Sequence, residues 1–265
     1  MKMDASILFL GTGGSMGIPV IGCECSVCQS PSPYNKRLRP SLLLSFGGKK
    51  ILIDVGPDFR YQALKYRIKT LDGIILTHTH FDHIAGIDDV RIFCFQQKKP
   101  LPCLLSRETL EELKIRYHYL MPPHEKEEEY KTKLTFQILS GDFGITTFQG
   151  MKVEYVSYVQ MDMKVNGFRF GNMAYITDIS RYTEEILDIL KGVKTLIISG
   201  TSFKRSRGHI TLEEAIEFAG KVGASQTYLT HITHETDHEE IKQKLPSNIE
   251  LSYDGLELKT TVDTI

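Results

Sequence analysis

Four residues that commonly bind metals, His78, His80, Asp82 and His83, crowd into six positions directly after the apolar segment Ile74-Ile75-Leu76. The apolar segment predicts a buried strand, so these residues lie at its C-terminal end, where the chain turns toward a helix. His78 and His80 share one side of an extended backbone, whereas the other two lie in the following turn. Borderline-soft divalent metals prefer this mixture of nitrogen and oxygen ligands. The pattern predicts a metal centre at a strand end.

Length and composition set limits on the fold and on the partners. The 265 residues are 41% hydrophobic and 25% charged, so the chain can form a sizeable core and disorder is not expected. The net charge of −1 gives no electrostatic footprint for nucleic acid or an anionic membrane. No apolar run reaches about 18 residues, so no membrane span is expected. The first ten residues hold only a short apolar stretch, too short for a signal peptide, and we expect a cytoplasmic protein.

Strands with scattered helices occur twice along the chain. This order predicts one domain, residues 1–265, in which two sheets pack face to face with helices outside. Two strands flanking Asp254-Gly255 are expected to form a closing hairpin, after a short helix capped by Thr236 and Glu239. We expect strands at 7–10, 41–46, 50–55, 73–77, 195–199 and 227–230, and helices at 106–117, 184–191 and 212–222.

Cys23, Cys25 and Cys28 cluster in a loop flanked by glycine and proline. Because no export signal precedes them, this cluster indicates metal binding and not disulfides. Free loop thiols are the alternative. Cys94 and Cys103 are expected to be ordinary core residues.

Two more polar residues end apolar strands. Asp178 follows residues 174–177, and His231 follows residues 228–230. A carboxylate such as Asp178 can bridge two cations, and rigid strand ends can hold such a residue in place. The alternative for Asp178 is a helix N-cap.

Several motifs along the chain match one known family. They are Gly11-Thr12-Gly13-Gly14, the run from Gly22 through Cys28, Asp54-Val55-Gly56-Pro57-Asp58, the run from His78 through Asp89, Gly208-His209, and Leu229 through His234. Together they resemble the PhnP-type phosphodiesterases of the metallo-β-lactamase superfamily, over about residues 5–260. The resemblance implies an α/β fold: an αββα sandwich of two mixed sheets with helices outside and the site at one edge.

The resemblance also implies an active-site ligand set. His78 and His80 would hold one metal ion, and a second ion would be held by Asp82, His83 and His231. Asp178 would bridge the two ions, and Asp54 would hydrogen-bond a metal-bound histidine.

A separate structural zinc is implied as well. Cys23, Cys25 and Cys28 together with His234 match the family's zinc ligands. Three thiolates and one imidazole make a closed tetrahedral site, which would fix the loop to the chain at His234.

Residue 160 departs from the family pattern. Relatives usually carry a metal-binding histidine after the strand corresponding to residues 152–159, and this chain has Gln160 there. Glutamine is a weak, neutral oxygen ligand, so we predict that the first metal site is weakened or that only the second metal binds tightly. Asp162 is an alternative ligand, although two residues farther along a strand displace it by about 6–7 Å.

The resemblance implies a metal-dependent hydrolase that acts on small phosphodiesters, cyclic ones included. Two divalent cations, zinc or manganese, would activate a hydroxide that attacks phosphorus. His209 matches the general acid, and Asp82 is counted with it among the catalytic residues. The alternative for His209 is a polar residue at a helix N-terminus. Lys204, Arg205 and Arg207 either attract a phosphate or form an exposed basic loop.

Two rival functions stay open. A tRNA 3′-processing endonuclease needs a basic surface or a flexible arm, whereas this chain is near neutral and its charged stretch His124 to Lys133 is mixed in sign. A non-catalytic, metal-binding relative is the other, because of Gln160. Hydrolysis of β-lactams is a weaker third option. We expect a small-molecule partner and neither nucleic acid nor a membrane, with a homodimer as a guess.

Overall fold

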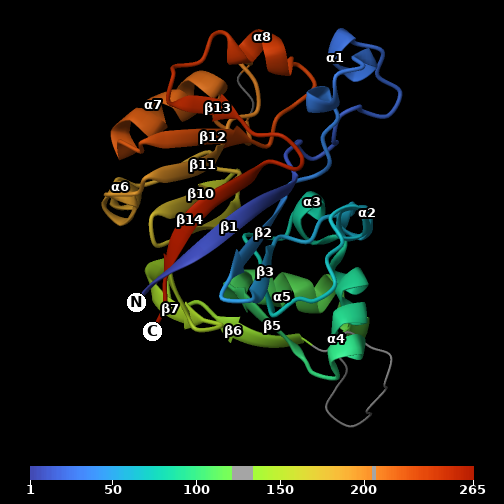
Figure 1. Cartoon of the computed structure of the whole chain (residues 1–265), viewed down its shortest axis with the longest axis vertical. Helices are drawn as coiled ribbons and strands as arrows, with labels where there is room; N and C mark the ends of the chain where they lie inside the picture. The colour runs from blue at the N-terminus through green and yellow to red at the C-terminus, as the bar shows by residue number, and fades with distance from the viewer. Residues whose placement is uncertain (121–133, 205–206) are drawn as a thin grey trace.

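Two mixed sheets of seven strands each pack face to face, and helices cover both outer faces (Figure 1). The structure is a computed structural model that describes residues 1–120, 134–204 and 207–265. The αββα sandwich is therefore confirmed. The charged stretch at 124–133 lies outside the described residues, as do Arg205 and Ser206.

The first sheet has the strand order β14-β1-β2-β3-β4-β5-β6. Strands β14 to β3 pair antiparallel, and β3 to β6 pair parallel. Its strands are β1 (Lys2–Gly11), β2 (Ser41–Phe46), β3 (Lys49–Ile53), β4 (Gly73–Ile75), β5 (Leu101–Leu105), β6 (Leu134–Ile138) and β14 (Glu257–Asp263).

The second sheet has the order β13-β12-β11-β10-β9-β8-β7. Strands β10 to β13 pair parallel and β7 to β10 pair antiparallel. Its strands are β7 (Phe143–Phe148), β8 (Met151–Gln160), β9 (Met163–Phe170), β10 (Met173–Ile176), β11 (Thr195–Ser199), β12 (Gln226–Thr230) and β13 (Ile249–Leu251).

Helices pack on the outer faces through their apolar sides. Residues of α2, α4 and α5 form one buried cluster with the first sheet, and residues of α6, α7 and α8 form another with the second. The helices are α1 (Ser26–Gln29), α2 (Phe59–Lys65), α3 (Phe81–Ile84), α4 (Arg91–Gln97), α5 (Arg107–Arg116), α6 (Glu185–Leu190), α7 (Leu212–Val222) and α8 (His238–Lys242), with the 3₁₀ turns η1 (Pro33–Asn35), η2 (Ile87–Val90) and η3 (His118–Leu120). Within the described ranges, none of these helices combines the length and apolar character that a bilayer crossing requires.

The main core lies between the sheets. Leu42 and Leu44 of β2 face this layer while Leu43 faces the outer helices, because side chains alternate along a strand. Ile197 of β11 faces the same layer from the second sheet. Strands covered on both faces read as continuous apolar runs, which is why these segments could be recognised from the sequence.

The predicted N-terminal caps of two helices are confirmed. The Ser106 hydroxyl accepts from the Thr109 N–H at the start of α5. Thr211 and Glu214 form the expected capping box of α7. In α8 the prediction was wrong, because Asp237 is the N-cap and accepts from two backbone N–H groups.

The expected C-terminal hairpin is also wrong. Strands β13 and β14 flank Asp254-Gly255 but belong to different sheets. The Asp254 carboxylate accepts from Thr12 Oγ1 at 2.7 Å and from the Leu38 N–H at 2.7 Å. These contacts hold the crossing between the sheets in place, and β14 then pairs with β1.

Candidate metal centre

The predicted active-site ligands meet where strands of the two sheets end. Their ligand atoms fall into groups whose members lie within 4.8 Å of one another. The groups are His78 with His80 and Asp178, Asp82 with His83 and His231, and Asp178 with His209 and His231. The first two match the grouping expected from the sequence, and Asp178 lies between them. The third was not expected.

The first group presents two ring nitrogens to one point. His78 Nε2 lies 3.1 Å from His80 Nδ1. The Thr77 hydroxyl donates to Asp54 at 2.9 Å, so its oxygen accepts from His78 Nδ1–H, also at 2.9 Å. This places the His78 proton on Nδ1 and leaves Nε2 free for a cation.

The second group encloses a similar point. Asp82 Oδ2 lies 3.2 Å from His231 Nε2 and 3.5 Å from His83 Nε2. Asp178 reaches both imidazoles, with Oδ1 at 3.2 Å from His231 Nε2 and Oδ2 at 3.1 Å from His83 Nε2. Ligand atoms bonded at about 2.0–2.2 Å to one tetrahedral cation are about 3.4 Å apart, so the spacing fits a divalent metal.

Asp54 orients His83 for this task. Its fully buried carboxylate accepts from His83 Nδ1 at 2.7 Å, and from the Thr77 N–H at 2.8 Å. His83 therefore keeps a proton on Nδ1, and its buried Nε2 faces Asp82 and Asp178, on the side from which a cation would bind.

Unusual backbone geometry places three of these residues at strand ends. Asp54, Asp178 and His231 have φ values of 61°, 55° and 60°, in the left-handed region. Asp and His tolerate this region better than most side chains do. Gly14 lies against the third of these residues, because a Cβ at position 14 would be 3.3 Å from His231 Nδ1.

Buried charges make the carboxylates anionic and raise the pKa of two imidazoles that face them. Burial acts to lower the pKa of His83 and of His231, but Asp178 and Asp82 outweigh it. Burial acts to raise the pKa of Asp178, but the charges of His231 and His83 outweigh it and hold this pKa well below its usual value. The pKa of Asp82 is lowered in the same way, burial being outweighed chiefly by His83. Burial, with His83 nearby, lowers the pKa of His78. Two carboxylates are thus anionic and His78 is neutral.

Gln160 and His209 adjoin the bridging carboxylate. Gln160 Nε2 donates to Asp178 Oδ1 at 3.0 Å and lies 3.1 Å from His209 Nε2. His209 Nδ1 lies 3.5 Å from Asp178 Oδ1, so His209 sits close enough to act on a substrate or on a cation. Burial lowers the pKa of His209 to about 4, with Asp178 opposing. Asp162 is exposed in the β8–β9 turn, so its expected place on the strand is wrong. It belongs to none of the ligand groups, although it lines the same cavity as His80 and Gln160.

Two cavities reach the centre, one beside His231 and the other beside His80. One of about 430 Å³ is lined by Gly14, His209 and His231. Another of about 490 Å³ is lined by His80 and Gln160. A small molecule can therefore approach either group of ligands.

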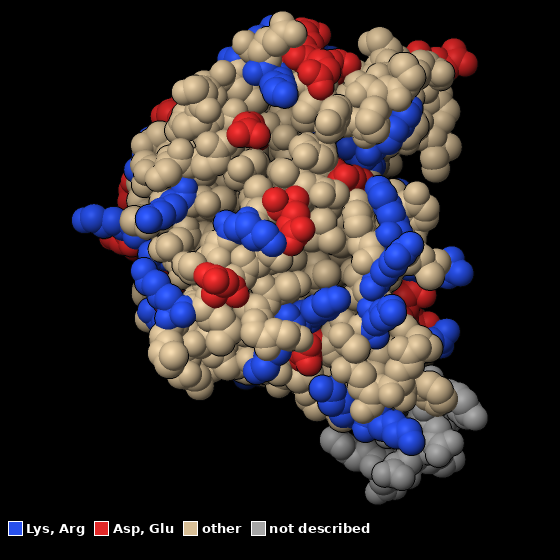
Figure 2. Space-filling model, viewed as in Figure 1, with Lys and Arg blue, Asp and Glu red and all other residues tan. Residues whose placement is uncertain are grey.

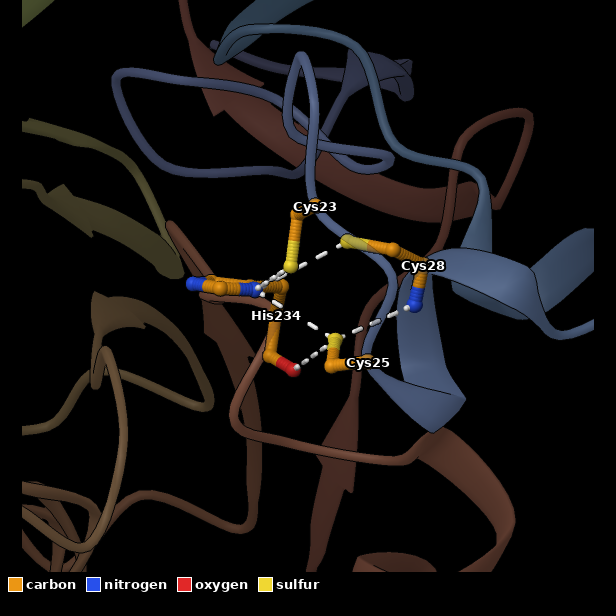
Figure 3. Close-up of side chains that lie close together, drawn as sticks. All are labelled: Cys23, Cys25, Cys28 and His234. Atoms are coloured by element: carbon orange, nitrogen blue, oxygen red, sulfur yellow. Dashed lines mark hydrogen bonds between the residues drawn. The ribbon is translucent and has the colours of Figure 1, made fainter.

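The cysteine group forms a second candidate site, on the loop that carries α1 (Figure 3). His234 Nδ1 lies 3.3 Å from Cys23 Sγ, 3.5 Å from Cys25 Sγ and 3.7 Å from Cys28 Sγ. Sulfur and nitrogen bound to one tetrahedral zinc are about 3.6 Å apart. The donor set and its spacing fit a closed zinc site.

The chemistry of one thiol supports this assignment. The Cys28 N–H donates to Cys25 Sγ, and this bond, with His234, lowers the pKa of Cys25 to about 6. Cys25 is thus a thiolate at neutral pH, the form that binds metal. Cys94 and Cys103 are buried, as predicted.

Three comparisons with known proteins bear on this geometry. A family model described as "Beta-lactamase superfamily domain" matches residues 49–232. The solved structure of "a New Diphosphatase from the PhnP Family" has 36% sequence identity and a TM-score of 0.91, and the alignment covers 99% of each chain. Octanoyltransferase of Porphyromonas gingivalis is 35% identical over 260 residues, which are 94% of this chain and 50% of that protein.

A shorter match involves an RNA-processing enzyme. Ribonuclease Z of Methanopyrus kandleri is 34% identical over 89 residues, which are 33% of this chain and 26% of that protein. The chain spans about half of the octanoyltransferase and a quarter of the ribonuclease. The activities named for those whole proteins are therefore not transferred by the matches.

Proposed function

Because the chain belongs to the metallo-β-lactamase superfamily, in its PhnP-like branch, we propose that it is a metal-dependent hydrolase of small phosphodiesters or diphosphates. The observation that carries the proposal is Asp178, whose carboxylate lies between two separate ligand groups. A centre that holds two cations about one carboxylate suits displacement at phosphorus. The Cys23 group would hold a structural zinc.

Each group of residues has a distinct part in the reaction. Divalent cations, zinc or manganese, would supply Lewis-acid stabilisation of the phosphate charge and a water of lowered pKa. His78, His80, Asp82, His83, Asp178 and His231 would hold them. Asp54 fixes the tautomer of His83, and Asp82 Oδ2 lies 3.2 Å from His231 Nε2.

His209 is the candidate proton donor. Because burial lowers the pKa of its ring to about 4 in the free protein, the ring would take up its proton once an anionic phosphate lies beside it. His209 lines the cavity beside His231 and lies 3.5 Å from Asp178. From there its ring can reach a leaving oxygen bound in the cavity. A positioned acid contributes about 10²–10⁴-fold to the rate when the leaving group is poor. Of the neighbouring basic residues, Lys204 lines the same cavity as His209 and pairs with Glu235 at 2.9 Å, and Arg207 lines a further cavity with His209.

Turnover of linear and cyclic phosphodiesters and of diphosphate esters, with Mn²⁺, Zn²⁺ or Fe²⁺, tests the proposal. His209→Ala should lower kcat by about 10²–10⁴-fold on an alkyl ester and much less on a p-nitrophenyl ester, whose leaving group needs no proton. His118→Ala, at an exposed histidine of η3, is the matched control. An unchanged kcat on the alkyl ester would remove His209 from the mechanism, and no turnover with any metal would favour a non-catalytic relative.

Nucleic acid is the less favoured substrate. Figure 2 shows Lys and Arg gathered along the right-hand and lower part of the face drawn, with a few Asp and Glu among them, and the net charge of the chain is −1. Binding of tRNA depends on a basic surface and weakens steeply with salt. Salt-dependent tRNA binding at micromolar protein would support the endonuclease alternative, and light scattering tests the proposed homodimer.

A further inference from the structure

The two ligand groups of the centre are unequal. One has a carboxylate and two imidazoles of its own, from Asp82, His83 and His231. The other has only the imidazoles of His78 and His80, and depends on a share of Asp178. Gln160 lies beside this poorer group, where it lines the same cavity as His80.

The hydrogen bonds of Gln160 show that its amide does not make up the difference. An amide nitrogen has two N–H donors, and both are accounted for: one goes to Asp178 Oδ1 at 3.0 Å and the other to the ring of His209. The reversed amide would set its oxygen against the Asp178 carboxylate. Gln160 therefore turns its nitrogen toward Asp178, and a nitrogen that carries two protons cannot bind a cation. Its Oε1 is buried and has no hydrogen-bond partner among the described residues, so it could become a ligand only if the amide moved.

Asp178 is already heavily engaged. Its Oδ1 accepts from Gln160 and lies 3.2 Å from His231 Nε2. Its Oδ2 accepts from the Thr177 hydroxyl at 2.6 Å and lies 3.1 Å from His83 Nε2. Both oxygens of the carboxylate thus contact the group of Asp82, His83 and His231 or accept hydrogen bonds, which leaves little of it for a cation at His78 and His80.

We propose that the centre binds one divalent cation tightly, at Asp82, His83 and His231, and takes the second at His78 and His80 only together with substrate. Phosphate oxygens of the substrate supply the ligands that Gln160 withholds. This inference rests on the proposed function, because it requires a phosphate-bearing substrate. The cavity of about 490 Å³ lined by His80 and Gln160 gives the phosphate its route to the poorer group.

Hard anionic oxygens suit this task. Cations such as Mn²⁺ and Mg²⁺ are commonly held by a few protein ligands together with substrate phosphates. Because binding free energies are linked, phosphate must tighten the second cation by the same factor as the cation tightens phosphate. The coupling can therefore be measured from either side.

Titration of the protein with Mn²⁺, followed by electron paramagnetic resonance of the free ion, counts the equivalents without any turnover. Zinc is retained at the cysteine group, whose thiolates are poor ligands for Mn²⁺. We expect one tight equivalent and a second that is at least about tenfold weaker, a usual factor for an altered metal environment. Inorganic phosphate should tighten the second equivalent by about 5- to 150-fold and leave the first nearly unchanged.

Substitutions at position 160 provide the decisive comparison. Gln160→His adds the missing imidazole and should tighten the second equivalent at least about tenfold without phosphate, with a smaller phosphate effect. Gln160→Glu adds an oxygen ligand of the same reach, and is the second variant if the first is unstable. Gln137→His, on the edge strand β6 and outside the residues that line the centre, is the matched control and should change neither equivalent.

Each outcome bears on the proposal. Two equivalents of equal affinity in the unsubstituted protein, or a second equivalent indifferent to phosphate, would overturn it. A second tight equivalent that disappears in His209→Ala would also overturn it, because His209 would then supply the missing ligand. Phosphate-dependent binding without hydrolysis of any ester would support this inference while refuting the proposed activity, so the two fail separately.

Discussion

Replacing Asp54 with asparagine should weaken metal binding while leaving the fold in place. The carboxylate accepts from the Thr77 N–H, from the Thr77 hydroxyl and from His83 Nδ1. Asparagine can keep its oxygen on the Thr77 N–H, which cannot reverse its direction, and must then turn its NH₂ toward His83. Asparagine also tolerates the left-handed backbone at this position.

The consequence is a change of tautomer. His83 Nδ1 becomes an acceptor, and its proton moves to Nε2, the atom that faces Asp82 and Asp178. A cation can bind only if the proton returns to Nδ1, where it meets the asparagine NH₂. A buried donor left without a partner costs about 1–3 kcal/mol, so the dissociation constant should rise by about 5- to 150-fold.

Competition with a chelator measures this constant, and the nitrogen-15 shifts of the imidazole report the tautomer. Circular dichroism checks the fold, because the chain has no tryptophan to serve as a fluorophore. Asp58→Asn is the matched control, since Asp58 binds Arg39 outside the centre and should leave metal affinity unchanged. An Asp54→Asn protein that is folded and binds metal within twofold of the original would refute the reasoning.

Two other regions give predictions of their own. Cys28→Ser should abolish tight zinc binding at the cysteine group. It should also lower the free energy of unfolding by on the order of a few kcal/mol, because the binding free energy of a structural zinc contributes to folding. Elemental analysis measures the zinc and urea unfolding measures the stability, and unchanged zinc content would contradict the assignment. Burial, with Arg37 beside it, lowers the pKa of His238 to about 4, so the unfolded chain binds the extra proton first and His238 should cost stability as pH falls from about 6.5 toward 4. A pKa lowered from 6.5 to about 4 corresponds to a loss of up to about 3 kcal/mol, and urea unfolding of His238→Gln at pH 4.5 and 7.5 should show a smaller pH dependence than the unsubstituted protein does.

Local signals in the sequence were enough to find most of the centre. His78, His80, Asp82 and His83 are nearly contiguous, so their convergence follows from one strand and one turn. The cysteine cluster is equally local, and it needed only His234 from a distant segment. The structure places all of these where the sequence predicted, and their action as ligands stays a prediction.

Pairing and packing between distant segments determine the features that the sequence did not predict. The Asp254-Gly255 turn fits a hairpin locally, but β14 pairs with β1 from the other end of the chain. Asp162 had seemed to continue a strand, whereas Met161, at φ 52°, begins the tight turn that carries it away. The contact of His209 with Gln160 depends on the packing of separate segments, which no local pattern encodes.

The left-handed strand ends at Asp54, Asp178 and His231 have a bearing on how such a site arises. Branched and bulky side chains are strained in that conformation, whereas glycine, asparagine, aspartate and histidine adopt it with least difficulty. Two of those four are metal ligands. The backbone thus restricts which residue types are tolerated at these positions before any selection for catalysis acts. Random mutations that are tolerated there introduce a metal-binding side chain more often than they would on an ordinary strand.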